Sequence, residues 1–177
     1  CEESAGAVIE FAGRVCNGAG RPYSLSAMKP STIASVPDDN ALHDLALDLG
    51  TRLRTRGQTL ATAESCTGGW IAKMITDIPG CSEWFEAGLA AYSYEAKQAL
   101  LGVRPETLTE HGAVSRETVL EMVSGALTRT GAHLAVAVTG IAGPSGGTPG
   151  KPVGTVWIAW KKRGGYPTAE LFQFAGD

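Results

Sequence analysis

The chain has 177 residues, of which 44% are hydrophobic and 19% are charged, and its formal net charge is -3. This length allows one domain with a substantial core, and the composition excludes a disordered or fibrous protein. The acidic balance and an aromatic content of 7% argue against capture of nucleic acid or of an anionic membrane, so we expect neither as a partner.

The first 37 residues differ in composition from the rest of the chain. Turn-forming and small polar residues dominate their second half, as at 29–32. A short helix over 5–15 is compatible with the sequence but has no strong cap. We expect residues 1–37 to form an N-terminal tail, flexible or partly an upstream extension, with Met28 as a candidate natural start.

A folded domain is expected over residues 38–177, and its first half follows from caps and periodicity. The Asp and Asn side chains at 38–40 supply N-cap oxygens to a helix that Gly57 ends. A short strand is predicted at 59–63, followed by a helix after Gly69. The apolar positions of the two helices are Leu42, Leu45, Ala46, Leu49, Leu53, Trp70, Ile71, Met74 and Ile75.

The second half of the domain continues the alternation of strands and helices. Residues 85–93 are predicted to form a strand buried on both faces, and 94–101 a short helix. Ser115 can cap a longer helix that Gly131 ends. Further strands are predicted at 134–139, 153–160 and 170–174, the last two as a hairpin.

This alternation predicts the fold class. Helices that alternate with buried strands, closed by a hairpin, indicate a single α/β domain, layered, with a mixed β-sheet flanked by helices. The chain ends at Asp177 without a final capping element, so we expect the domain to lack its last helix.

Two glycine-rich segments, 65–69 and 140–147, each follow an apolar strand. Ligands of open α/β sheets bind at the carboxyl ends of strands, so both segments are candidate walls of one site. Gly68 and Gly69 open a helix whose N–H groups suit a phosphate or a developing oxyanion. The alternative is that these glycines only permit a tight turn.

Ser65 lies between a strand and a helix, where a nucleophile would be exposed. Its alternative role, shared with Thr67, is to cap the helix, and Cys66 is a rival nucleophile. No histidine falls in a site segment, although His111 is the best placed. A lysine with a depressed pKa can replace histidine as the base.

Lys97 is the candidate base, which would accept the Ser65 proton directly or through Tyr92. The Tyr92 phenol could relay the proton or hold the orientation of the lysine. The ordinary alternatives are an exposed helix lysine and a core tyrosine with a solvated hydroxyl.

Metal and cofactor sites are not expected. His43, His111 and His133 are scattered without ligand spacing, and the four cysteines form no C-x-x-C pair. We expect reduced thiols and a cytoplasmic location, since no apolar run approaches the roughly 20 residues of a membrane span and the N-terminus lacks a basic, apolar leader.

Several uncommon sequence words occur in order and together resemble the CinA C-terminal domain family over residues 40–177. These words are TAESCTGG (62–69), IPGCS (78–82), YSYEAK (92–97), LGV (101–103), EHGAVS (110–115), VTGIAGP (138–144), KPVGTV (151–156) and FAGD (174–177).

The resemblance implies a metal-independent amidohydrolase that converts nicotinamide mononucleotide to nicotinate mononucleotide and ammonia, in pyridine-nucleotide salvage. It places the family's catalytic residues on Ser65, Tyr92 and Lys97. On this reading, amides of Thr67, Gly68 and Gly69 stabilise the oxyanion, and Thr139, Gly140, Gly143 and Lys151 hold the ribose phosphate.

The chain also departs from the family pattern. Members often carry a larger N-terminal domain, for which this chain has no room, and usually continue past Gly-Asp with an arginine and a final helix. A homodimer is a mild expectation. Two alternatives stay open: a catalytically silent nucleotide-binding or competence-associated module, and an amidase or deacylase for another substrate.

Overall fold

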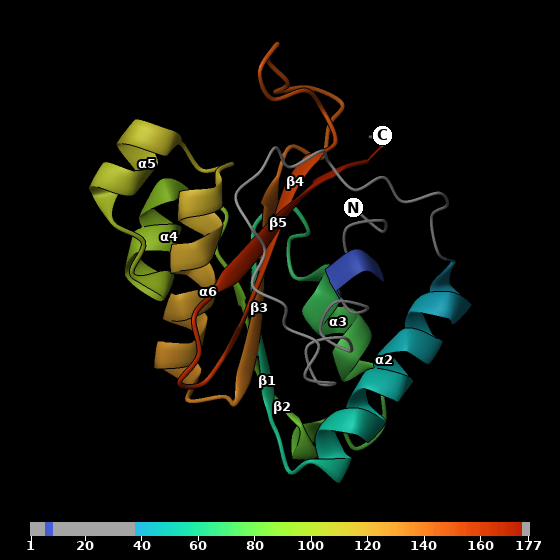
Figure 1. Ribbon diagram of the computed structural model, residues 1–177. Coiled ribbons are helices and arrows are strands. Elements are labelled where there is room, and N and C mark those ends of the chain that lie inside the picture. Colours follow the sequence, from blue (N-terminus) through green and yellow to red (C-terminus); the bar gives the residue numbers. More distant parts are fainter. Residues whose placement is uncertain (1–5, 9–37, 175–177) are drawn as a thin grey trace.

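The computed structural model describes residues 6–8 and 38–174, and its centre is one five-stranded sheet with the order β2-β1-β3-β4-β5 (Figure 1). Strands β2, β1 and β3 are parallel, whereas β4 and β5 are antiparallel to their neighbours. The sheet is therefore mixed, as predicted. The strands are β1 Leu60–Glu64, β2 Phe85–Ala90, β3 Leu134–Gly140, β4 Thr155–Lys162 and β5 Thr168–Gln173.

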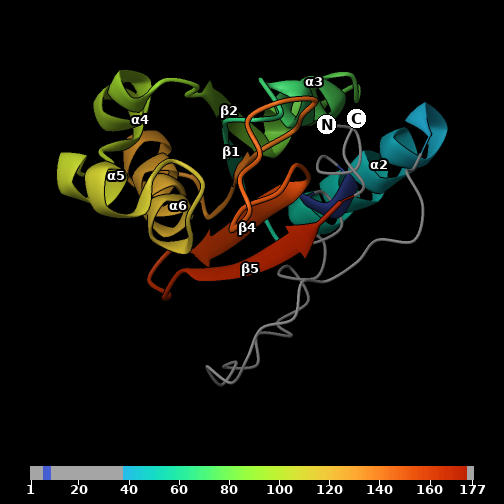
Figure 2. The ribbon, with the colours of Figure 1, turned by 90° about the horizontal axis from the view of Figure 1, so that it is seen from above.

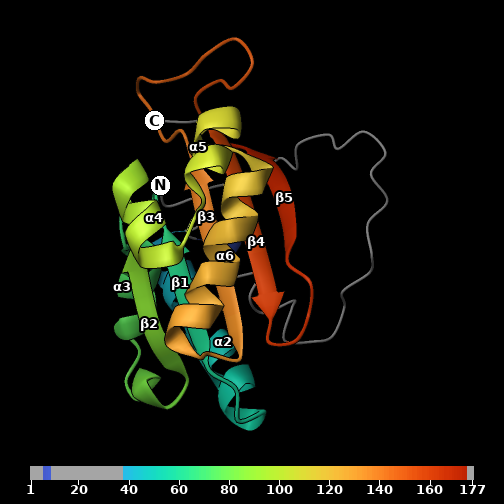
Figure 3. The ribbon, with the colours of Figure 1, turned by 90° about the vertical axis from the view of Figure 1, so that its left-hand side faces the viewer.

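Helices cover both faces of the sheet and make a three-layer α/β fold, which confirms the predicted class (Figures 1 and 3). One face carries α2 (Asp39–Thr55) and α3 (Trp70–Thr76). The other carries α4 (Tyr94–Leu101), α5 (Pro105–His111) and α6 (Arg116–Thr130). Within the described residues, no helix combines the length and the hydropathy that crossing a bilayer requires.

Polar side chains fix where three of these helices begin. Asp38 accepts a hydrogen bond from the Ala41 N–H at 2.8 Å, and Ser93 accepts one from Ala96 at 3.0 Å. Ser115 caps α6 in the same way. Each cap accepts a hydrogen bond from a first-turn N–H that has no partner within the helix. The Ser93 cap therefore sets the start of α4 and, with it, the position of Lys97.

Side-chain size differs between the two faces of the sheet. Leucine, valine, isoleucine and phenylalanine side chains face α2 and α3. Toward α4–α6 the central strands present alanines instead: Ala61, Ala63, Ala135, Ala137 and Ala159. Small side chains let α6 lie close to the sheet, and α4 then packs on α6.

Two elements differ from expectation. Strand β2 is an edge strand whose residues alternate between half-buried and exposed, so the prediction of burial on both faces was wrong. Helix α5 and the 3-10 turn at Cys81–Glu83 were missed. Pro105 in the first turn of α5 was the available signal, because proline is tolerated there and fixes a helical φ.

Part of the expected tail packs in the core. Residues 6–8 are helical, and Ala7 and Val8 are buried in the same cluster as α2 and α3. The rest of the predicted helix over 5–15, together with residues 9–37 and 175–177, lies outside the described residues.

The close packing of α6 on α4 predicts a large cost for Gly125→Ala. A Cβ at Gly125 would lie 1.7 Å from the Leu101 carbonyl oxygen, so the helices must separate. We expect the free energy of unfolding to fall by about 2–3 kcal/mol or more, measured by urea denaturation. Gly150→Ala is the control, because a Cβ there meets nothing within 4 Å. Equal urea midpoints of unfolding for the two variants would contradict this packing.

Candidate active site

Three parallel strands end at one edge of the sheet and bring the predicted segments together (Figure 1). Ser65 directly follows β1, Ala91 and Tyr92 follow β2, and β3 ends at Gly140. Main-chain hydrogen bonds join these ends: the Ser65 N–H donates to Val138 and the Ala91 N–H donates to Glu64. The serine therefore sits at the junction of three strand ends, where α/β sheets bind ligands.

Lys97 reaches this edge from the first turn of α4 and contacts the serine directly. Its Nζ lies 2.8 Å from Ser65 Oγ, 2.8 Å from the Ala91 carbonyl oxygen and 2.7 Å from that of Tyr92. The lysine side chain is completely buried, and Ser65 is only 7% exposed. This long-range contact joins two of the three predicted catalytic residues.

Burial of Lys97 changes its acidity. Removing the ammonium from water disfavours the charged form and lowers the pKa of Lys97 to about 8. All three of its hydrogen-bond partners are neutral groups. A substantial fraction of the amine is therefore unprotonated near neutral pH, as a general base requires.

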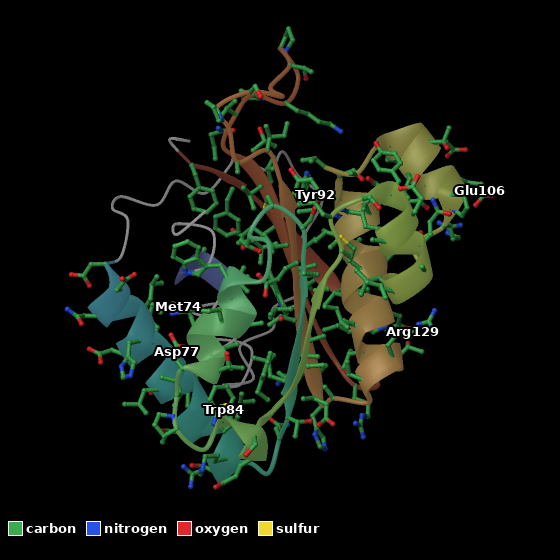
Figure 4. All side chains as sticks on the ribbon, turned by 180° about the vertical axis from the view of Figure 1, so that it is seen from behind. Met74, Asp77, Trp84, Tyr92, Glu106 and Arg129 are labelled. Carbon is green, nitrogen blue, oxygen red and sulfur yellow. The ribbon has the colours of Figure 1, made fainter. Side chains whose placement is uncertain are left out.

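Tyr92 does not lie where the sequence prediction placed its phenol. Its side chain is 79% exposed, at the end of the sheet where the strands β1 and β2 finish (Figure 4). Its main-chain carbonyl accepts a hydrogen bond from Lys97 Nζ, and the same Nζ contacts Ser65 Oγ directly. Of the two predicted routes for the Ser65 proton, this geometry favours direct transfer to Lys97, because the lysine side chain is long enough to reach the serine.

The carboxylate of Glu64 occupies the start of α3. Its two oxygens accept hydrogen bonds from the N–H groups of Gly69, Ile71 and Ala72 and from the hydroxyls of Thr62 and Thr67. Glu64 is 1% exposed. A buried carboxylate with this many donors, placed at a helix N-terminus, is strongly stabilised by the helix dipole.

Glu64 corrects the prediction for the turn at 67–69. The Gly69 N–H is bound to Glu64, the Gly68 N–H donates to the Ser65 carbonyl, and the Thr67 hydroxyl is bound to Glu64. The Gly68 and Gly69 amides therefore hold the turn rather than a phosphate or an oxyanion, whereas the role of the Thr67 amide stays a prediction. Gly68 and Gly69 have φ of +61° and +100°, so the tight-turn reading of the glycines is confirmed. Sequence reasoning missed Glu64, although an acidic residue just before a helix start was a signal.

The rival nucleophile and the rival base are less well equipped. Burial raises the pKa of the Cys66 thiol to about 11, so it stays protonated at neutral pH. His111 is exposed, and its ring nitrogens lie 3.8 Å from Glu110 and 3.9 Å from Glu117. Ser65 and Lys97 are thus the pair that the structure favours.

The loop between β3 and β4 is anchored by its predicted phosphate-binding residues. Thr139 is buried and donates to the Ala113 carbonyl, and Lys151 Nζ donates to the carbonyls of His111 at 3.0 Å and Val114 at 2.7 Å. The Gly140 backbone packs directly on Thr155 and Val156, because a Cβ there would lie 2.8 Å from the Thr155 oxygen and 2.7 Å from Val156 Cγ2.

The two carbonyl contacts of Lys151 hold the loop with two of the three N–H donors of its ammonium. The role of Lys151 as a phosphate ligand stays a prediction. The loop between β3 and β4, which contains Gly143, rises beyond the strand ends and, seen from above, reaches toward α3 (Figures 2 and 3).

Across residues 6–8 and 38–174, no cluster of three or more His, Cys, Asp or Glu side chains could hold a metal ion.

Comparisons with known proteins agree with the sequence resemblance. A family model described as the CinA C-terminal domain matches residues 42–177. The nicotinamide-nucleotide amidohydrolase PncC of Escherichia coli (strain K12) is 52% identical over 139 residues, which cover 78% of this chain and 84% of that protein. PncC of Pseudomonas putida is 53% identical over 133 residues, covering 75% and 82%.

A solved structure shares the fold. The competence/damage inducible protein CihA from Agrobacterium tumefaciens superposes with a TM-score of 0.75 at 45% identity, covering 81% of this chain and 87% of that one.

The Glu64 carboxylate predicts a specific loss of stability. In Glu64→Gln an NH2 group would face N–H donors of α3, leaving buried groups unpaired. We expect the free energy of unfolding to fall by about 2–4 kcal/mol, measured by chemical denaturation. Glu86→Gln on the exposed side of β2 should change it by less than about 0.5 kcal/mol. Indistinguishable midpoints would show that Glu64 does not hold the helix start.

Proposed function

The chain belongs to the CinA C-terminal domain family, and on that premise we propose that it hydrolyses the carboxamide of nicotinamide mononucleotide, with Ser65 as nucleophile and Lys97 as base. The products are nicotinate mononucleotide and ammonia. The substrate class follows from relatives named nicotinamide-nucleotide amidohydrolases, about half of whose aligned residues are identical here. The roles of Ser65 and Lys97 follow from their geometry.

One observation supports the dyad above all others: the three partners of Lys97 Nζ. The carbonyl oxygens of Ala91 and Tyr92 can only accept hydrogen bonds, so each retains an N–H of the amine. When Lys97 is neutral, its lone pair is left facing Ser65 Oγ, 2.8 Å away. The site is thus built to take a proton from the serine hydroxyl.

Acylation follows from this arrangement. Lys97 accepts the hydroxyl proton as Ser65 Oγ bonds to the carboxamide carbon. The C–N bond then breaks, and the Lys97 ammonium returns the proton to the departing nitrogen, which leaves as ammonia. We assign the oxyanion to the main-chain amide of Thr67, since those of Gly68 and Gly69 are already engaged.

Deacylation repeats the proton transfers with water. Lys97, neutral again, takes a proton from a water molecule whose oxygen bonds to the acyl carbon. The bond between the acyl carbon and Ser65 Oγ then breaks, and the Lys97 ammonium returns its proton to Ser65 Oγ. Each turnover consumes one water molecule and releases one carboxylic acid and one ammonia.

A catalytically silent binding module is the second candidate, and the burial of Lys97 counts against it. A fully buried amine with a lowered pKa weakens the folded state at neutral pH, because the charged form is disfavoured there. A protein that only binds nucleotide has no need for a buried lysine that lowers its stability. We also propose a cytoplasmic location, in keeping with the reduced thiol of Cys81.

Ser65→Ala tests the nucleophile. We expect ammonia release from nicotinamide mononucleotide to fall by about 10³-fold or more, with the fold retained by circular dichroism, because the attacking oxygen is removed. Wild type should keep its activity after chelator treatment. Ser82→Ala, at an exposed serine, is the control and should remain fully active. Full activity of Ser65→Ala would exclude a serine mechanism.

The pKa of Lys97 predicts the pH profile. Because the base must be unprotonated, kcat/KM should rise about tenfold per pH unit below its pKa of about 8 and level off above it. Initial rates between pH 6.5 and 9.5 would show this single ascending limb. Lys73→Met, at an exposed lysine, should keep the same midpoint. A profile that is flat, or that falls with pH, would remove Lys97 as the base.

A further inference from the structure

Tyr92, whose main chain contacts Lys97, carries a largely exposed aromatic ring. The Tyr92 side chain is 79% exposed, whereas Trp84, another large aromatic, is 1% exposed (Figure 4). A ring that remains in water contributes little to folding. Its position at the site therefore calls for a role in binding.

We propose that Tyr92 is the specificity-determining residue that receives the positively charged pyridinium ring of the substrate on the face of its phenol. This inference rests on the proposed function and deepens it. It assigns to Tyr92 recognition of charge in place of proton transfer.

The main chain of Tyr92 is fixed relative to the nucleophile. Its carbonyl accepts a hydrogen bond from Lys97 Nζ at 2.7 Å, and the same Nζ lies 2.8 Å from Ser65 Oγ. The preceding residue, Ala91, is buried and donates to the Glu64 carbonyl. Two hydrogen bonds therefore separate the Tyr92 backbone from the attacking oxygen, and its ring extends from that fixed point into solvent.

The substrate must place its ring in the same region. The carboxamide is bonded directly to the pyridinium ring, so a carboxamide carbon at Ser65 Oγ brings a flat cation within a few ångströms of the reacting atoms. The face of a phenol ring carries negative electrostatic potential and attracts such a cation by about 0.5–2 kcal/mol.

The charges around the site make this contact selective. When Lys97 is protonated, its ammonium repels the pyridinium; when it is neutral, that repulsion disappears. Glu64 is near in sequence, but its carboxylate is occupied by five donors at the start of α3. Glu95, in the first turn of α4, is exposed. The Tyr92 ring is thus an electron-rich surface anchored beside the nucleophile.

The test compares a cationic ring with a neutral one at equal size. Dissociation constants for nicotinamide mononucleotide and for its reduced, uncharged dihydropyridine form are measured by calorimetry with Ser65→Ala, which cannot turn over. Adding Tyr92→Leu should weaken the oxidised nucleotide by about 2- to 30-fold and the reduced one by less than about 2-fold. Tyr92→Phe should keep the preference, because it retains the ring.

A matched control is available at the opposite end of the sheet. Tyr166 lies in the turn between β4 and β5 and is 95% exposed, so Tyr166→Leu removes an exposed tyrosine without touching the site. Its two dissociation constants should not change.

The other outcomes overturn the inference. An equal loss for both nucleotides would mean a contact that ignores charge, and no loss would mean no contact. Equal effects of Tyr92→Phe and Tyr92→Leu would assign the role to the hydroxyl. The proposed function is judged separately, by ammonia release from wild type: its absence, with the charge preference intact, would reject the amidase and leave the binding role of Tyr92 standing.

Discussion

Burial of the Lys97 amine is the constraint on which the site depends. A lysine enclosed by protein must have every N–H satisfied, and here Ser65 Oγ and two carbonyls do so. Those carbonyls belong to the chain as it leaves β2, so the lysine also fixes that segment. The same contacts that make the buried amine tolerable direct its lone pair at the serine.

Glu64, which precedes Ser65 in the chain, and Lys97, which contacts it, have different electrostatic surroundings. The glutamate accepts main-chain hydrogen bonds and holds the start of α3, while the lysine lies among neutral partners that do not stabilise its charge. Because the carboxylate already fills the helix N-terminus, the substrate phosphate must be held elsewhere. The turn of Ser65 is thereby rigid before any ligand arrives.

The unequal faces of the sheet explain how α4 comes within reach. Alanines on β1, β3 and β4 let α6 approach the sheet, and Gly125 lets α4 approach α6. Ser93 then sets the start of α4, which places Lys97 in the first turn at the level of the strand ends. Packing of small residues far from the chemistry thus determines the distance between base and nucleophile.

Local signals were enough for the five strands, four of the helices, the mixed sheet and the candidates Ser65 and Lys97, because caps, periodicity and glycines act over a few residues. Only the tertiary structure decided the rest. It placed β2 at the edge of the sheet and buried Ala7 and Val8 in the core. It also placed the Glu64 carboxylate at the start of α3, hydrogen-bonded Lys151 to two main-chain carbonyls and left the Tyr92 ring exposed. Each of these depends on groups brought together from separate elements, and no local pattern records which donor will meet which acceptor across a fold.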